Sequence, residues 1–209
     1  MKKEPAIRIL VADDHYVVRM GVTAIINHER DMEVVAEANN GIQAVELFIE
    51  HKPDLALLDL RMPVKNGVEA AREIRKHCGT ARILMLTAFD GDEDIFRAMQ
   101  AGVQGYVLKN STGSHLIPAI RAVAAGEGWI PDEVAQRLTQ RQEYVPLAPR
   151  ELEVLHELAK GLANKQIATV LNLSEHTVKG YLKSILAKLH VCDRTEAVTV
   201  AIHRGLIHM

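Results

Sequence analysis

Five polar side chains in the first half of the chain stand directly after short apolar segments. Asp13 and Asp14 follow the first segment, and Asp59, Thr87 and Lys109 stand at the ends of three later ones. Each alone has an ordinary explanation, because an aspartate after a strand is usually a turn or cap residue and a lysine is usually a solvated charge. Three carboxylates, a hydroxyl and an ammonium in equivalent positions instead indicate one shared chemical site.

The carboxylates of this set predict a metal-assisted reaction. Three carboxylates held close together repel one another and need a cation, and oxygen ligands alone select Mg²⁺ or Mn²⁺ rather than zinc. A carboxylate beside such an ion can attack a phosphoryl group and form an aspartyl phosphate. Lys109 would then supply positive charge and Thr87 a hydroxyl group to the phosphoryl group. Asp59 is the best candidate for the nucleophile, because the adjacent Asp13 and Asp14 are suited to capture the metal.

The segments that must position these residues alternate between strand and helix. Short apolar runs predict strands at 7–12, 33–38, 54–60, 82–87 and 104–108. Apolar residues at helical spacing predict helices at 15–28, 41–51, 66–77, 92–101 and 111–125. This alternation is typical of an α/β domain in which helices cover both faces of a five-stranded parallel sheet. Ligands bind such sheets at the carboxyl ends of the strands, where the five polar residues stand.

Residues 5–126 resemble the receiver domain of bacterial two-component response regulators, a flavodoxin-like fold. The matching text is Asp13-Asp14, Asp59 within LLDLRMP, Gly67, Thr87-Ala88, Tyr106 and Lys109. The resemblance implies that Asp59 accepts a phosphoryl group from a sensor histidine kinase. It also implies that Mg²⁺ (or Mn²⁺) is held by Asp13, Asp14, Asp59 and the backbone carbonyl of Arg61. Thr87 and Tyr106 would form the switch pair that responds to phosphorylation.

Three further expectations concern residues around this site. Lys109 reads as a surface residue in a loop, so that replacing it with alanine should change stability by less than about 1 kcal/mol. Arg61 and Phe89 each lie two residues past a strand-end residue. They would border the path of hydrolytic water, or they are merely exposed loop side chains, and the sequence favours neither interpretation.

The second half of the chain is entirely helical in pattern. Residues 129–146 read as a linker with a short helix at 132–142, and apolar spacing predicts four helices in 147–209. Two short helices joined by a tight turn, with Asn164 and Ser174 as the expected N-caps, make a helix-turn-helix. The second helix of that motif enters the major groove of DNA. Residues 147–209 carry 8 Lys and Arg against 6 Asp and Glu, a net charge of +2.

The recognition helix has one apolar and one basic face. Its buried stripe should contain Val178, Leu182, Ile185 and Leu189, while Lys179, Lys183 and later Lys188 lie opposite. A lysine face is usually only solvated, but behind a helix-turn-helix the DNA-binding interpretation is favoured. Residues 147–207 resemble the LuxR-type domain of the NarL/FixJ subfamily through Arg150-Glu151, Asn164-Lys165, Thr177-Val178-Lys179, Lys188-Leu189 and Gly205-Leu206-Ile207. The resemblance implies that Lys179 and Lys183 face bases or phosphates and that Lys165 and Thr177 touch the DNA backbone.

Composition excludes several classes of protein. The chain has 209 residues, 48% hydrophobic and 25% charged, which suits two small globular domains rather than a disordered chain or a disulfide scaffold. Cys78 and Cys192 lie far apart and offer no zinc pattern, so they read as two reduced thiols. Asp13 and Asp14 interrupt the first apolar run too early for a signal peptide, and no run approaches the roughly 18 apolar residues of a membrane span. We therefore expect a cytoplasmic protein without a membrane partner.

The sequence as a whole predicts a phosphorylation-controlled transcriptional regulator. Residues 1–128 would be the receiver, 129–146 the linker and 147–209 the DNA-binding domain, acting as a dimer on promoter DNA and with RNA polymerase. We do not expect an enzyme beyond Mg²⁺-dependent phosphorylation and dephosphorylation at Asp59. Three alternatives remain: an aspartyl-phosphate phosphatase, a receiver that never takes phosphate, and a pure interaction module. The first would place an acid where Arg61 stands, and the second would lack an acid or the lysine.

Overall fold

The computed structural model describes residues 6–88, 91–141 and 145–207. Phe89 and the last residue of the expected 132–142 helix lie outside this part of the chain. The chain divides into two compact units, Met1–Phe89 with Phe96–Ala135 and Asp90–Ile95 with Gln136–Met209. The domain boundaries given above stay predictions.

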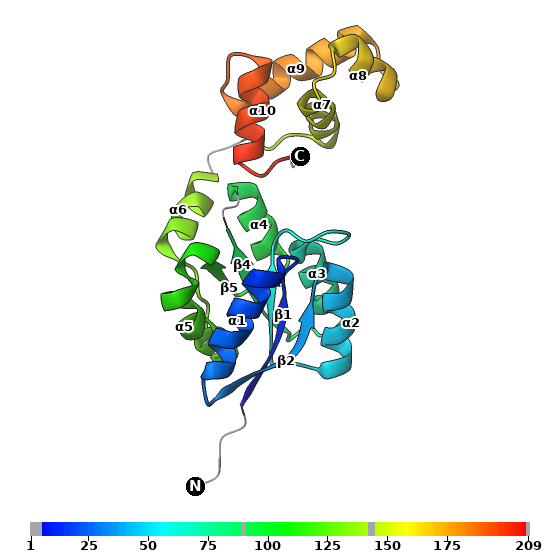
Figure 1. The fold of residues 1–209 in the computed structure, drawn as a ribbon. Helices are drawn as coiled ribbons and strands as arrows, with labels where there is room; N and C mark the ends of the chain where they lie inside the picture. The colour runs from blue at the N-terminus through cyan, green and yellow to red at the C-terminus, as the bar shows by residue number, and fades with distance from the viewer. Residues whose placement is uncertain (1–5, 89–90, 142–144, 208–209) are drawn as a thin grey trace. The chain divides into compact units, whose positions relative to one another are not determined.

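The sheet has the predicted five parallel strands (Figure 1). Its order is β2-β1-β3-β4-β5. β2 lies on one side of β1, whereas β3, β4 and β5 follow one another on its other side. The direction of strand addition therefore reverses between β1 and β3. Asp13 and Asp59 follow and end these two strands, at the switch point where such sheets bind ligands. The strands are β1 (Ile7–Ala12), β2 (Met32–Ala38), β3 (Leu55–Asp59), β4 (Arg82–Thr87) and β5 (Gly105–Leu108).

Helices join the strands in the predicted alternation. They are α1 (Tyr16–His28), α2 (Gly41–His51), α3 (Gly67–His77), α4 (Asp92–Gln100) and α5 (Thr112–Ala125), with a 3₁₀ turn η1 (Lys109–Ser111) before α5. Each predicted helix is found within a few residues of its expected bounds. Asn66, the expected first residue of α3, is its N-cap and accepts a hydrogen bond from the Glu69 N–H at 2.9 Å.

The core of this unit lies on both faces of the sheet. Ile9, Leu57 and Leu84 pack with Leu116 and Ile120 of α5 in one buried cluster. Every residue of β3 is buried, as expected for a central parallel strand covered on both sides. The strand that carries Asp59 is therefore held rigidly, and the position of its last side chain is fixed by the core.

Two glycines allow the loop between β3 and α3 to lie close to the end of β3. A Cβ atom on Gly67 would lie 2.2 Å from the backbone oxygen of Asp59, and the Gly67 N–H donates to the Leu60 carbonyl at 2.9 Å. A Cβ atom on Gly41 would lie equally close to the carbonyl oxygen of Lys65. Only glycine fits at these positions without moving the backbone.

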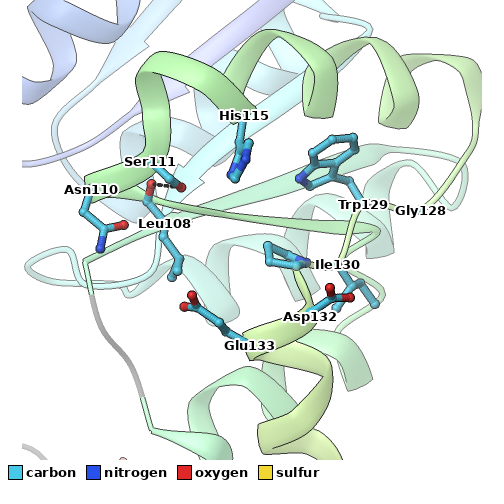
Figure 2. A pocket seen from close by; sticks show the side chains of 10 residues that line it. Leu108, Asn110, Ser111, His115, Gly128, Trp129, Ile130, Asp132 and Glu133 are labelled. Atoms are coloured by element: carbon cyan, nitrogen blue, oxygen red, sulfur yellow. Dashed lines mark hydrogen bonds between the residues drawn. The ribbon is translucent and has the colours of Figure 1, made fainter.

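A segment after α5 lies along the free edge of β5. Trp129 forms a parallel bridge with Gly105, and its carbonyl accepts the N–H of Tyr106 at 2.8 Å. Figure 2 shows Trp129 beside His115 of α5. Both line a pocket of about 600 Å³, and their ring centroids lie 6.2 Å apart. The sequence predicted only a linker from residue 129 onward. In the structure, Trp129 at its start is hydrogen-bonded to the sheet at Tyr106. Helix α6 (Asp132–Arg141) follows directly.

The second unit contains the predicted small helical bundle. Its helices are α7 (Pro149–Ala159), α8 (Asn164–Val170), α9 (Glu175–Leu189) and α10 (Arg194–His203). Val154, Ile167, Val178 and Ile185 form one buried cluster with apolar residues of α10. Four helices pack around this core, so the surface of α9 opposite Val178 and Ile185 is left to solvent.

The caps of the bundle confirm one expectation and overturn another. Ser174 caps α9 as predicted, accepting the Thr177 N–H at 3.0 Å. Asn164 was expected to cap α8, and this prediction is wrong because Ala163 occupies the cap position. The Gln166 side chain instead accepts the Ala163 N–H at 2.8 Å. The Gln166 side chain thus satisfies the N–H of the cap residue itself, while Ala163 has no side-chain oxygen to accept an N–H of the first turn.

Candidate functional site

The carboxyl ends of β1 and β3 bring three aspartates together. Asp13 and Asp59 are buried, with relative exposures of 0% and 3%. Asp14 is exposed, and ligand atoms of Asp13, Asp14, His15 and Asp59 all lie within 4.8 Å of one another. Residues 46 positions apart in sequence meet here because β1 and β3 are paired neighbours in the sheet. The sequence singled out the three aspartates but missed His15.

Lys109 bridges two of these carboxylates. Its Nζ lies 2.7 Å from Asp59 Oδ2 and 2.8 Å from Asp13 Oδ2. The lysine side chain is only 15% exposed. The expectation that Lys109 is a surface residue is therefore wrong, because the turn η1 directs its side chain under the loops into the acidic cluster.

Burial and the hydrogen bonds of the cluster shift the pKa values of Asp59 and Lys109. Burial is the largest influence on Asp59 and raises the pKa of its carboxyl, helped by the charge of Asp13 and opposed by the Lys109 hydrogen bond. Burial alone would lower the pKa of Lys109, but hydrogen bonds to Asp13 and Asp59 outweigh it, and the pKa of Lys109 is raised. Lys109 therefore stays charged and holds both aspartates in place.

The donor set of this cluster fits a hard divalent cation. Three carboxylates against one ammonium leave a net charge of −2 in a partly buried site, which a divalent ion would balance. Carboxylate oxygens are the ligands that Mg²⁺ and Mn²⁺ prefer. Asp13, Asp14 and Asp59 are the side chains that could hold such an ion.

The two expected switch residues are both buried. The register pairs Asp59 with Leu86 and pairs Thr87 with Leu108. Thr87 is therefore one residue beyond the partner of Asp59, and Lys109 is one residue beyond the partner of Thr87. Thr87 is 2% exposed and Tyr106 is fully buried. The side chains named by the sequence as hydroxyl and ammonium donors thus stand at the same edge as the aspartates.

Arg61 is placed by the turn that follows β3. Its side chain is exposed, and its N–H points to Asp59 Oδ1 at 3.4 Å. Its role as a carbonyl ligand stays a prediction. Its partner in the expected water path, Phe89, lies outside the described residues.

The bridging position of Lys109 predicts a large stability effect in the absence of metal. Lys109→Ala removes the ammonium that contacts both Asp13 and Asp59. Leaving buried charges unpaired should lower the free energy of unfolding by about 2 kcal/mol or more in EDTA. Urea unfolding with EDTA and with Mg²⁺ measures the effect, and Mg²⁺ should restore part of the loss. Lys76→Ala, at an exposed lysine of α3, is the control. A Lys109→Ala protein as stable as this control in EDTA contradicts the account.

Helix α9 presents a basic face to solvent. Lys179 and Lys183 are exposed on this helix, at its fifth and ninth residues, and Lys165 is exposed on α8. The Lys179 ammonium lies 2.8 Å from the exposed Glu175 carboxylate one turn earlier. The Thr177 hydroxyl lies 2.8 Å from Ser174 Oγ at the start of the helix. Four of the five predicted DNA-contacting residues are therefore accessible to solvent.

Lys188, the fifth predicted DNA contact, is engaged inside the bundle instead. Its Nζ lies 2.7 Å from a carboxylate oxygen of Glu151, which is only 5% exposed. The same carboxylate accepts the Ser184 hydroxyl at 2.6 Å and the Ala148 N–H at 2.7 Å. This network corrects the prediction for Lys188, whose ammonium ties α9 to α7. Ala148 is the N-cap of α7, and the Glu151 side chain also satisfies its backbone N–H.

The sequence carried a signal for this network that residue-by-residue reading missed. Ser184 and Lys188 are four residues apart and so lie on one face of α9. Glu151 falls on the buried side of α7, where an unpaired carboxylate would be costly. A buried acid opposite a polar pair at helical spacing predicts an ion pair between two helices.

The Glu151 network should stabilise the helical unit in a pH-dependent way. Burial would raise the pKa of Glu151, but hydrogen bonds from Lys188, Ser184 and the Ala148 N–H outweigh it, and the pKa is lowered. The stabilisation is therefore present above the ordinary glutamate pKa of about 4.3 and is lost as the pH falls through the lowered folded value. Glu151→Gln should cost about 1–3 kcal/mol at neutral pH.

Hydrogen exchange of α7 and α9 amides in the full chain measures this cost directly. Glu153→Gln is the matched control, because Glu153 lies on the same helix and pairs with the exposed Arg150. The Glu151 variant should lose protection at neutral pH, and the difference from wild type should shrink in acid. Equal protection in the two variants would refute the stabilising role.

The fold and the two sites define a class of protein. Residues 9–121 match the response regulator receiver domain, and residues 145–201 match the LuxR family of bacterial regulatory proteins. The chain belongs to the two-component response regulators that join a receiver to a LuxR-type helix-turn-helix domain. It is a phosphorylation-controlled DNA-binding regulator rather than a classical enzyme.

The chain matches several relatives over nearly their whole length. The chain is 39% identical over 207 residues to the response regulator protein VraR of Staphylococcus epidermidis, covering 97% of this chain and 99% of that protein. The structure of the response regulator ChrA of a heme-sensing two-component system is 38% identical, with a TM-score of 0.58 over 97% of this chain and 99% of that chain. RcsB of Salmonella typhimurium, studied for its DNA interaction, is 25% identical with a TM-score of 0.70 over 92% of this chain and 98% of that chain.

No helix among the described residues is long and apolar enough to cross a membrane.

Proposed function

We propose that Asp59 is the phosphoacceptor of this regulator and that its phosphorylation controls dimerisation and promoter binding. The observation that carries the proposal is the buried Asp59 carboxylate, held by Lys109 next to Asp13 at the switch point of the sheet. A sensor histidine kinase is the expected donor. In the transfer, an oxygen of Asp59 forms a bond to phosphorus, the bond from phosphorus to the donor histidine nitrogen breaks, and that nitrogen keeps the electron pair.

The chain's own residues divide this work. Asp13, Asp14 and Asp59 would hold Mg²⁺ or Mn²⁺, with the Arg61 carbonyl as a further ligand, and the bound ion would neutralise phosphoryl oxygens. Lys109 holds Asp59 in place before the reaction and offers its ammonium to the phosphoryl group afterwards. Thr87 would turn its hydroxyl toward the phosphoryl group, and Tyr106 would respond. The same site would catalyse its own dephosphorylation.

The Tyr106 backbone provides a short route from this switch to the linker. Its N–H is bonded to the Trp129 carbonyl three residues before α6. The Trp129 N–H also donates to the Gln104 carbonyl at 3.0 Å, so a movement of β5 would be transmitted to the linker by two backbone hydrogen bonds. We propose a receiver at 1–128, a linker at 129–146 and a DNA-binding domain at 147–209, with Lys165, Thr177, Lys179 and Lys183 at the DNA surface. A phosphorylated dimer would recruit RNA polymerase in the cytoplasm, where promoter DNA is found.

Selection of bound DNA from random sequence, with and without acetyl phosphate, tests the proposed function. Phosphorylated protein should enrich a repeated site whose half-site centres are about 10 bp apart, matching a dimer. Unphosphorylated protein should enrich the same site more weakly. Failure of both samples to enrich any sequence contradicts the proposal.

A further inference from the structure

His15 faces the acidic cluster from the loop after β1. Its backbone N–H donates to Asp13 Oδ1 at 2.8 Å, which fixes the loop against that carboxylate. Its ring atom Nδ1 lies 2.8 Å from Asp14 Oδ1 and 3.3 Å from Asp13 Oδ1. Lys109 contacts the other oxygen of Asp13, so Oδ1 is the oxygen turned toward the imidazole.

The distances from Nδ1 to the two carboxylate oxygens are close to those between neighbouring metal ligands. Around an ion with metal–ligand bonds of about 2.1 Å in octahedral geometry, adjacent ligand atoms lie about 3.0 Å apart. Nδ1 and the two carboxylate oxygens approach this separation without rearrangement. The imidazole side chain is 66% exposed, so its Nε2 can carry the proton and remain solvated while Nδ1 offers its lone pair.

We propose that His15 Nδ1 is a direct ligand of the divalent ion and makes this a mixed nitrogen and oxygen site. The inference rests on the proposed function, which places the ion at Asp13, Asp14 and Asp59. Imidazole favours transition metals, whose affinity rises from Mn²⁺ to Ni²⁺, whereas Mg²⁺ takes oxygen ligands. His15 therefore influences which divalent ion binds: with it, the site prefers transition metals over Mg²⁺ more strongly than an all-oxygen site would.

The direct test is the electron spin echo spectrum of Mn²⁺ bound to the full-length protein. The wild type should show ¹⁴N modulation from a coordinated imidazole, and His15→Asn should bind Mn²⁺ without it. His28→Asn, at an exposed histidine at the far end of α1, should keep the modulation. Bound Mn²⁺ without nitrogen modulation in the wild type overturns the ligand role and leaves the proposed metal site intact.

A competition experiment measures the selectivity at the same site. Ni²⁺ and Mg²⁺ are titrated separately against bound Mn²⁺, and the signal of released Mn²⁺ reports displacement. Removing a residue that only hydrogen-bonds a metal ligand typically lowers metal affinity about 10–100-fold, and removing a ligand itself should cost at least as much. His15→Asn should therefore weaken competition by Ni²⁺ at least about tenfold relative to competition by Mg²⁺. An unchanged ratio overturns the inference. Absence of Mn²⁺ binding by the wild type, or binding unaffected by Asp14→Asn, overturns the proposed metal site itself.

Discussion

Asp59→Asn should abolish the uptake of a phosphoryl group from acetyl phosphate. The change keeps the shape of the side chain but removes the nucleophilic oxygen charge at the end of β3, where Lys109 holds it 2.7 Å from its ammonium. Wild-type protein should gain one hydroxylamine-sensitive phosphoryl group per chain, measured by intact-protein mass. Adding EDTA should prevent this gain in the wild type, because the carboxylate cluster cannot act without its cation.

Asp54→Asn is the matched control for this experiment. Asp54 is an exposed aspartate just before β3, and its carboxylate accepts the Arg8 N–H at 2.9 Å, a bond that asparagine can also accept. This variant should be phosphorylated like the wild type. Stoichiometric labelling of the Asp59 variant, or loss of labelling in the control, would show that the phosphoacceptor lies elsewhere.

Lys179→Ala and Lys183→Ala should each weaken DNA binding by about 1–3 kcal/mol if their ammonium groups reach bases. Both lysines are exposed on α9, and Lys179 lies in its first half, the part of a recognition helix that meets base edges. A base contact predicts weaker discrimination between sites, whereas a phosphate contact predicts a uniform loss and a salt slope lower by about one. We expect a base contact for at least one of the two. Titrations of full-length protein on a selected site at several salt concentrations distinguish these cases.

Three further variants in the same titrations separate DNA contact from effects on stability. The Glu175 carboxylate lies 2.8 Å from the Lys179 ammonium, and this ion pair must break before Lys179 can contact DNA. Glu175→Gln should therefore strengthen DNA binding. Lys188→Ala should lower the stability of the helical unit through loss of the Glu151 pair rather than change the salt slope. Lys76→Ala in α3 should change neither property. If neither Lys179→Ala nor Lys183→Ala alters binding, the DNA surface has been assigned to the wrong face of α9.

The fold was predictable because its signals are local and repeated. Apolar runs and helical spacing identify the strands and helices, and the switch point of a parallel sheet then brings Asp13, Asp59, Thr87 and Lys109 to one edge. The resemblance to receivers and LuxR-type domains rests on the same residues. Neither line of reasoning needs side-chain geometry, which is why both identified the acidic cluster correctly.

The errors share one physical cause, which is that residue type does not report burial or partners. Lys109 lies in a loop by sequence, yet the turn η1 carries its ammonium between two buried carboxylates. Lys188 belongs to the basic face of α9 by type, yet Glu151 on another helix captures it. His15 was overlooked because one histidine among ten carries no pattern, and only its distance to Asp14 reveals a role.

The central claim is that phosphorylation of Asp59 controls DNA binding. The measurement that tests it most directly is the affinity of full-length protein for a selected site, with and without acetyl phosphate, in the wild type and in Asp59→Asn. Coupling between two sites of this kind is worth about 5–150-fold in affinity. The account predicts a gain within this range for the wild type and none for Asp59→Asn. Equal affinity of the wild type in both conditions, or the same gain in Asp59→Asn, would contradict it.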